Sequence, residues 1–109
     1  MGVEKALVIL SGEIKTPPLS MPARREIGFL IRKLQLGIPL EMPGSRPMPA
    51  VGRRCHELRV NDENRTWRVI YRIDANAILV AAVFSKKTNK TPSRLLQQAK
   101  RLLSRYDTG

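Results

Sequence analysis

The second half of the chain alternates apolar and polar residues in a pattern that predicts neighbouring β-strands. In residues 56–60 and 66–73 every second side chain is apolar, and only Ile70 breaks the alternation. Residues 78–84 are apolar on both faces, which is typical of an interior strand. The two intervening turns are short and contain Asp and Asn, so we expect these three strands to form an antiparallel meander.

The flanking regions predict a further strand and two helices. The aliphatic run from Val3 to Leu10 indicates a first strand. Apolar residues recur at helical spacing from about Pro22 to Leu36 and again in the last part of the chain. In this closing helix Thr91 is the expected N-cap and Pro92 the first helical residue. Residues 38–54 contain four prolines and are expected to form a loop without regular structure.

Together these elements predict an α+β fold, with a single domain over residues 1–109. The expected architecture is a small antiparallel sheet of three to four strands, with the N-terminal and C-terminal helices packed on one side. Side chains along a strand alternate between faces, so residues that alternate with the apolar set share the other face, which is then open. The cations expected on this open face or at the end of its last strand are Arg59, Arg68, Arg72, Lys86 and Lys87.

Charge points to a polyanionic partner. The chain has 20 Lys and Arg residues against 9 Asp and Glu residues, a formal net charge of +11. Most of this excess lies after Gly52, where 13 basic residues stand against 5 acidic ones. Nucleic acid is the leading candidate for the partner. A hydrophobic content of 42% excludes a solvated polybasic tail, because such a chain can form a core.

Several other classes of protein are excluded by composition. Cys55 is the only cysteine, so neither an internal disulfide nor a cysteine-based zinc finger can form. The longest apolar run is far shorter than a membrane span, and we therefore expect a cytoplasmic protein without a membrane partner. No spacing of His, Asp and Glu suggests a metal site, and no cofactor is expected. His56 and Cys55 are interpreted as structural residues, and the strand parity of Trp67 and Tyr71 favours the core over base stacking.

Three segments in order carry a family resemblance. They are His56-Glu57-Leu58-Arg59-Val60, Trp67-Arg68-Val69-Ile70-Tyr71-Arg72 and Phe84-Ser85-Lys86-Lys87-Thr88-Asn89-Lys90-Thr91-Pro92. With the basic closing helix, they resemble the phage-derived, HigB-like branch of the RelE/ParE toxin superfamily from about residue 36 to residue 106. The resemblance implies a RelE-like fold and the toxin of a type II toxin–antitoxin pair.

The resemblance further implies a metal-independent endoribonuclease that cleaves mRNA on the ribosome and uses the RNA 2′-OH as nucleophile. The implied partners are mRNA, the ribosome with its rRNA, and a cognate helix-turn-helix antitoxin. The expected catalytic residues are Arg59, Arg68, Lys86 and Lys87, and the expected RNA-binding residues are Arg53, Arg54, Arg72 and Lys90. Among these, Arg68 is expected to hold the scissile phosphate, so that Arg68→Ala abolishes cleavage while stability hardly changes.

Two other functions stay open at this point. A ParE-like toxin would act on DNA gyrase through protein contacts and would not cut RNA, although it shares the fold. A basic RNA-binding module would lack catalysis altogether. Several cations on one sheet face favour the nuclease, because a gyrase-binding protein has no need of such a cluster.

Overall fold

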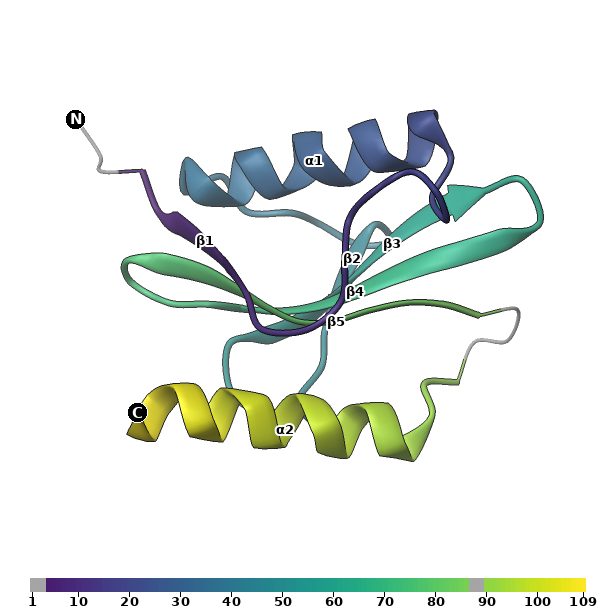
Figure 1. Cartoon of the computed structure of the whole chain (residues 1–109). Helices are drawn as coiled ribbons and strands as arrows, with labels where there is room; N and C mark the ends of the chain where they lie inside the picture. Colours follow the sequence, from purple (N-terminus) through teal and green to yellow (C-terminus); the bar gives the residue numbers. More distant parts are fainter. Residues whose placement is uncertain (1–3, 87–89) are drawn as a thin grey trace.

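The computed structural model describes residues 4–86 and 90–109, and it confirms the α+β class (Figure 1). The strands are β1 (Ala6–Ile9), β2 (Ser45–Pro47), β3 (Cys55–Asp62), β4 (Arg65–Ile73) and β5 (Ala77–Lys86), and the helices are α1 (Met21–Gln35) and α2 (Ser93–Thr108). Each strand and helix predicted from the hydrophobic pattern is present, with ends that differ by no more than three residues.

The strands of the described residues form one sheet in the order β1-β5-β4-β3-β2. The predicted antiparallel meander of β3, β4 and β5 is confirmed. β1 lies parallel to β5, so the sheet is mixed and five-stranded rather than antiparallel with three or four strands. β2 lies within residues 38–54, so the prediction that this loop lacks regular structure is wrong. Pro47 fits there because the outer side of an edge strand needs no backbone donor.

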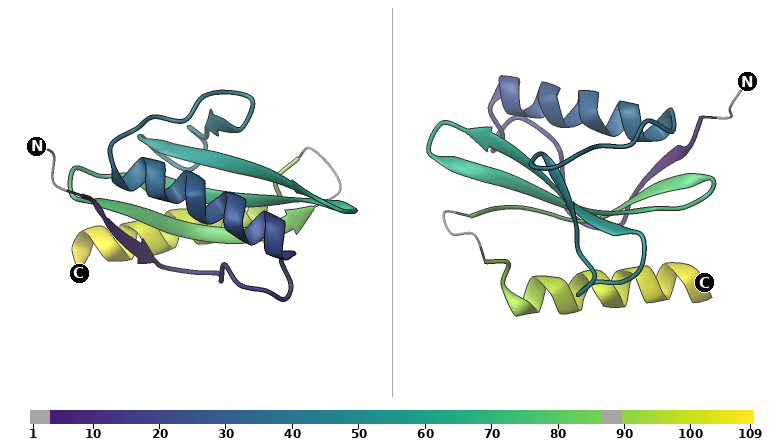
Figure 2. Two further views of the ribbon diagram at one scale, coloured as in Figure 1. Left: turned by 90° about the horizontal axis from the view of Figure 1, so that it is seen from above. Right: turned by 180° about the vertical axis from the view of Figure 1, so that it is seen from behind.

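The two helices cover opposite faces of the sheet, which corrects the prediction that both pack on one side (Figures 1 and 2). Ile27 of α1 is buried in one apolar cluster with Val69 of β4. Leu103 of α2 is buried in another cluster with Ile70, the next residue of the same strand. Because neighbouring residues of β4 point to different covered faces, the polar–apolar alternation breaks at Ile70. The same double burial explains why residues 78–84 are apolar on both faces.

The start of α1 is fixed by hydrogen bonds that also tie it to the sheet. Ser20 is the N-cap, and its Oγ accepts a hydrogen bond from the backbone N–H of Ala23 at 3.1 Å. The Ser20 N–H donates to Oδ2 of Asp62 at the end of β3, also at 3.1 Å. Trp67 donates its indole N–H to the same oxygen at 2.9 Å. The backbone hydrogen bonds from Ser20 and Glu63 are the main reason that the pKa of Asp62 falls to about 2.

The start of α2 differs from the prediction by one residue. The N-cap is Pro92, the helix begins at Ser93, and no side chain caps it. Thr91, the predicted N-cap, instead donates its hydroxyl hydrogen to Glu57 of β3. Within the part of the chain that the structure describes, neither helix has the length and apolar character needed to cross a membrane.

Candidate nucleic-acid interface

The predicted parity of three arginines is confirmed, but the face that they share is not open. Arg59 of β3 lies directly opposite Arg68 of β4 in the strand register, and Arg72 lies further along β4. Ile70, between the last two, belongs to the cluster covered by α2. The prediction of an open cationic face is therefore wrong over most of its length, because α2 packs on that face.

Arg68 lies beneath the sheet surface in a buried ion pair. Its residue is 1% exposed, and its Nη1 lies 2.6 Å from Oε1 of Glu57, a residue with no exposed surface. Arg46 of β2 approaches the same oxygen through Nη2 at 3.1 Å, and Thr91 donates to Oε2 at 3.0 Å. Burial by itself raises the pKa of Glu57, but the hydrogen bonds from Arg68 and Thr91 outweigh it, so the pKa is lowered. The prediction that Arg68 presents its guanidinium on an open surface is therefore corrected.

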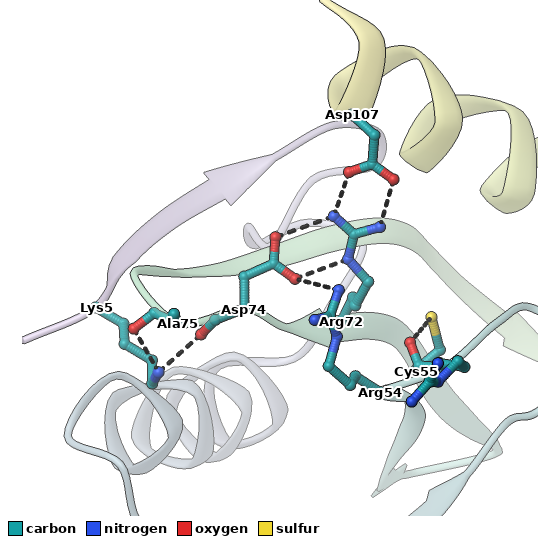
Figure 3. A network of polar contacts seen from close by, with 8 residues as sticks. Lys5, Arg54, Cys55, Arg72, Asp74, Ala75 and Asp107 are labelled. Atoms are coloured by element: carbon teal, nitrogen blue, oxygen red, sulfur yellow. Dashed lines mark hydrogen bonds and ion pairs between the residues drawn. The ribbon is translucent and has the colours of Figure 1, made fainter.

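Arg72 is also committed to acidic partners, at the opposite end of the covered face (Figure 3). Its Nε donates to Oδ1 of Asp74 at 2.8 Å, and its Nη2 donates to Oδ1 of Asp107 at 2.6 Å. The hydrogen bonds from Arg72 lower the pKa of Asp107. This network fastens the C-terminal end of α2 to β4. Arg72 is 7% exposed, so its predicted role as an RNA-binding residue does not fit its position.

Arg59 differs from both in having no acidic partner among residues 4–86 and 90–109. Its side chain is half-buried and, with Pro43, Gly44 and Asn61, lines a pocket of about 210 Å³. The backbone N–H of Arg59 donates to the Gly44 carbonyl at 2.8 Å, which holds the 43–44 loop beside the pocket. The β3–β4 hairpin extends beyond the N-terminal end of α2 in both figures, and none of the residues that line the Arg59 pocket belongs to α2.

Of the predicted lysines, the structure describes the backbone of Lys86 and the position of Lys90. Lys86 is the last residue of β5, and its backbone pairs with Thr66 of β4. Lys87 lies outside the described residues. Lys90 is exposed on the approach to α2. The structure thus brings Arg59 and the backbone of Lys86 to one end of the sheet.

Arg53 and Arg54 lie near the C-terminal end of α2, so these predicted RNA-binding residues form no cluster with Arg59. Both are exposed and line a pocket of about 350 Å³ together with Arg72 and Lys100. Arg54 also lies 3.6 Å from Asp74 through its Nη2. The part of β3 from Cys55 to Arg59 separates this group from Arg59, because each residue of an extended strand adds about 3.3 Å along its length.

The residues interpreted as structural are confirmed in that role. Trp67 and Tyr71 are buried in the cluster beneath α1, and the Tyr71 hydroxyl forms a 2.6 Å hydrogen bond with Ser45. His56 is half-buried and stacks on Tyr71 with ring centroids 5.4 Å apart. Cys55 is buried, and this burial raises the pKa of its thiol.

Sequence reasoning missed Glu57, which binds Arg68, and Arg46, which binds the same carboxylate. Glu57 has the same strand parity as Arg59, so a carboxylate on the cationic face was visible in the alternation. That parity was the available signal, since a buried carboxylate needs cations or hydrogen-bond donors around it. Nothing in the sequence pattern indicated that Arg46 would bind Glu57, because β2 was not predicted. The described residues contain no group of three or more His, Cys, Asp or Glu side chains placed to hold a metal ion.

Comparison with protein families gives a match to the family described as phage-derived protein Gp49-like (DUF891), over residues 17–104. The match covers most of the chain and includes both helices' packing residues and the whole meander. The chain therefore belongs to the Gp49-like family, which is associated with the toxins of toxin–antitoxin systems. No match specific to the RelE or HigB branch was found. Comparison with curated proteins and with solved structures gave no match.

Proposed function

We propose that this chain is the toxin of a type II toxin–antitoxin pair and that it is a metal-independent, ribosome-dependent mRNA endoribonuclease. Its partners in this proposal are mRNA, rRNA and an antitoxin protein. Membership of the Gp49-like family supports the toxin class. The observation that carries the nuclease is Arg59, a half-buried arginine without an acidic partner among the described residues, at the edge of a pocket.

An arginine in this setting is suited to bind a phosphate. A half-buried guanidinium has lost part of its water, and a charge-assisted hydrogen bond to a phosphate oxygen replaces that water. Arg68 does not have this capacity, since Glu57 already neutralises it. We therefore assign the phosphate-binding role to Arg59, and to Arg68 the role of a positioning residue in the strand beside it. Lys86 is the second cation of the proposed site, two strands away from Arg59 and about 12 Å from it between Cα atoms by sheet geometry.

The proposed reaction needs charge stabilisation more than any other catalytic contribution. The RNA 2′ oxygen forms a bond to the adjacent phosphorus, and the bond from phosphorus to the 5′ oxygen breaks. The 2′ oxygen loses its proton, and the leaving 5′ oxygen gains one. The pentacoordinate transition state carries one more negative charge than the substrate, so a cation beside the non-bridging oxygens stabilises it selectively.

We expect Arg59→Ala to lower the rate of mRNA cleavage by about 10²–10³-fold, the usual cost of losing one such donor. Arg59→Lys should recover part of the rate, because a lysine keeps the charge without the bidentate fork. The measurement is induced expression followed by mapping of new 5′ ends on cellular mRNA. Arg25→Ala is the matched control, since Arg25 is an exposed arginine on α1, on the far side of the sheet.

Two results would overturn the proposal. In the first, Arg59→Ala cleaves mRNA as fast as the parent protein. In the second, the parent protein arrests growth without producing new 5′ ends, and purified protein inhibits supercoiling by DNA gyrase. The second result would favour the ParE-like alternative.

A further inference from the structure

The outer face of α2 carries a straight row of three arginines and one glutamine that the proposed cleavage site does not use. Arg94, Gln98, Arg101 and Arg105 are spaced at i, i+4, i+7 and i+11, and all four are exposed. This spacing places them in one line along the helix. The first and last Cα atoms are about 16 Å apart at 1.5 Å per residue. We call these four residues the α2 row.

The charge of the α2 row is not neutralised by the protein. None of its arginines forms an ion pair among residues 4–86 and 90–109. The one acidic residue of α2, Asp107, is held by Arg72 at 2.6 Å. Lys100 and Arg53, which line the pocket at the C-terminal end of α2, extend the positive surface and also have no acidic partner there. The buried acidic side chains of the sheet therefore bind groups within the protein, and the outer side of α2 stays cationic.

We propose that the α2 row binds the phosphate backbone of double-helical RNA. Arginine and glutamine donate hydrogen bonds to phosphate and sugar oxygens without reading sequence. A protein partner is less suitable, because the row has no apolar side chain to form the core of a protein interface. A single RNA strand is also less suitable, because such sites stack bases on aromatic side chains and the row has none. Tyr106, the exposed aromatic residue of α2, lies about 100° around the helix from the row.

This docking surface is separate from the Arg59 pocket. The row lies on the side of α2 opposite Ala99 and Leu103, which pack on the sheet, whereas the Arg59 pocket is lined by Pro43, Gly44 and Asn61 and by no residue of α2. Binding of a duplex by the row therefore does not require the chain to be a nuclease. If the proposed function holds as well, the row holds a helical part of the RNA while Arg59 reaches a single strand.

The test measures binding of a roughly 16-base-pair RNA duplex at several salt concentrations, a length matched to known duplex-binding domains. The variant is Arg94→Ala/Arg101→Ala/Arg105→Ala. Its control is Lys15→Ala/Arg24→Ala/Arg25→Ala, which removes the same net charge from other parts of the surface. Each lost phosphate contact reduces the slope of log K against log salt by roughly 0.7–0.9. We expect the slope of the row variant to fall by about 2–3 and its affinity at 0.1 M salt to fall by about 100-fold.

Comparison ligands and one further variant make the outcome decisive. The control variant should keep nearly all of the parental slope, and both triple variants should keep the parental thermal midpoint because the replaced side chains are on the surface. Equal losses in the two triple variants would overturn the proposal, since net charge alone would then explain binding. So would tighter binding of single-stranded RNA or of poly-glutamate than of the duplex. Arg59→Ala should bind the duplex normally, so loss of cleavage and loss of docking are measured independently.

Discussion

The carboxylate of Glu57 determines which arginines of the sheet are available to bind an anion. Glu57 accepts hydrogen bonds from Arg68 and Arg46 and from the Thr91 hydroxyl, and it has no contact with solvent. The positive charge of Arg68 is therefore matched inside the protein. Arg59, directly across from Arg68 in the register, has no such partner among the described residues. Two arginines on one face thus have different chemistry because one buried carboxylate is within reach of only one of them.

We expect Glu57→Ala to lower the free energy of unfolding by about 3–5 kcal/mol, because it leaves Arg68 buried without its counter-charge. Arg68→Ala should also destabilise the protein, which reverses the sequence-based expectation of an unchanged stability. Glu57→Gln/Arg68→Met removes both charges and should recover much of the loss. Urea denaturation of the three variants measures these effects.

Cleavage by the double variant separates a positioning role of Arg68 from a catalytic one. With the fold retained, a cleavage rate near that of the parent is expected if Arg68 only supports the strand. An Arg68→Ala protein as stable as the parent would contradict the structural role.

At the scale of elements, the hydrophobic pattern predicted the meander and both helices, but it did not predict how they pack together. Alternation identified β3 and β4, and the structure explains the break at Ile70 by the burial of β4 on both faces. Nothing in residues 3–10 specifies a partner strand, so the parallel pairing of β1 with β5 could not be predicted. The face of the sheet on which α2 packs could not be predicted either, because an amphipathic helix requires an apolar surface but its pattern does not identify which surface that is. The burial of Arg68 and Arg72 follows from that packing, so their placement could not be predicted either.

The connection from β1 to α1 passes so close to β5 that only glycine fits at residue 12. Gly12 has φ +91°, and a Cβ built there would lie 2.8 Å from Cβ of Val83. We expect Gly12→Ala to lower the free energy of unfolding by about 2 kcal/mol or more, from backbone strain and overpacking together. Gly28→Ala is the matched control: it lies in α1 with nothing within 4 Å of the new Cβ, and should stabilise by about 0.5–1 kcal/mol. Equal effects of the two substitutions in thermal denaturation would contradict the close approach.

At the scale of the whole molecule, the acidic residues stabilise the fold more than they balance its charge. Asp62 links α1 to the β3–β4 turn, Glu57 links three strands and the start of α2, and Asp107 links the end of α2 to β4. The cations that they leave unmatched include those on the outer side of α2 and Arg59 at its pocket. Because the sheet holds its carboxylates inside, the two candidate RNA-binding surfaces stay positive. The same arrangement makes the fold sensitive to acid.

The expected pH dependence follows from the direction of three pKa shifts. Folding lowers the pKa of Glu57, of Asp107 and of Asp62, the last to about 2. A carboxylate with a lowered pKa contributes stability at pH values above its unfolded pKa, near 4, and that contribution is lost as pH falls through the folded value. We expect the thermal midpoint to be nearly constant from pH 7 to about 5 and to fall steeply between about pH 4.5 and 2. Self-repulsion adds to this fall, because protonation of nine acidic residues raises a net charge that is already +11.

Asp62→Asn should have a lower midpoint at pH 7 and a shallower decline in acid, and a parental midpoint that stays level down to pH 2.5 would show that these carboxylates do not hold the elements together.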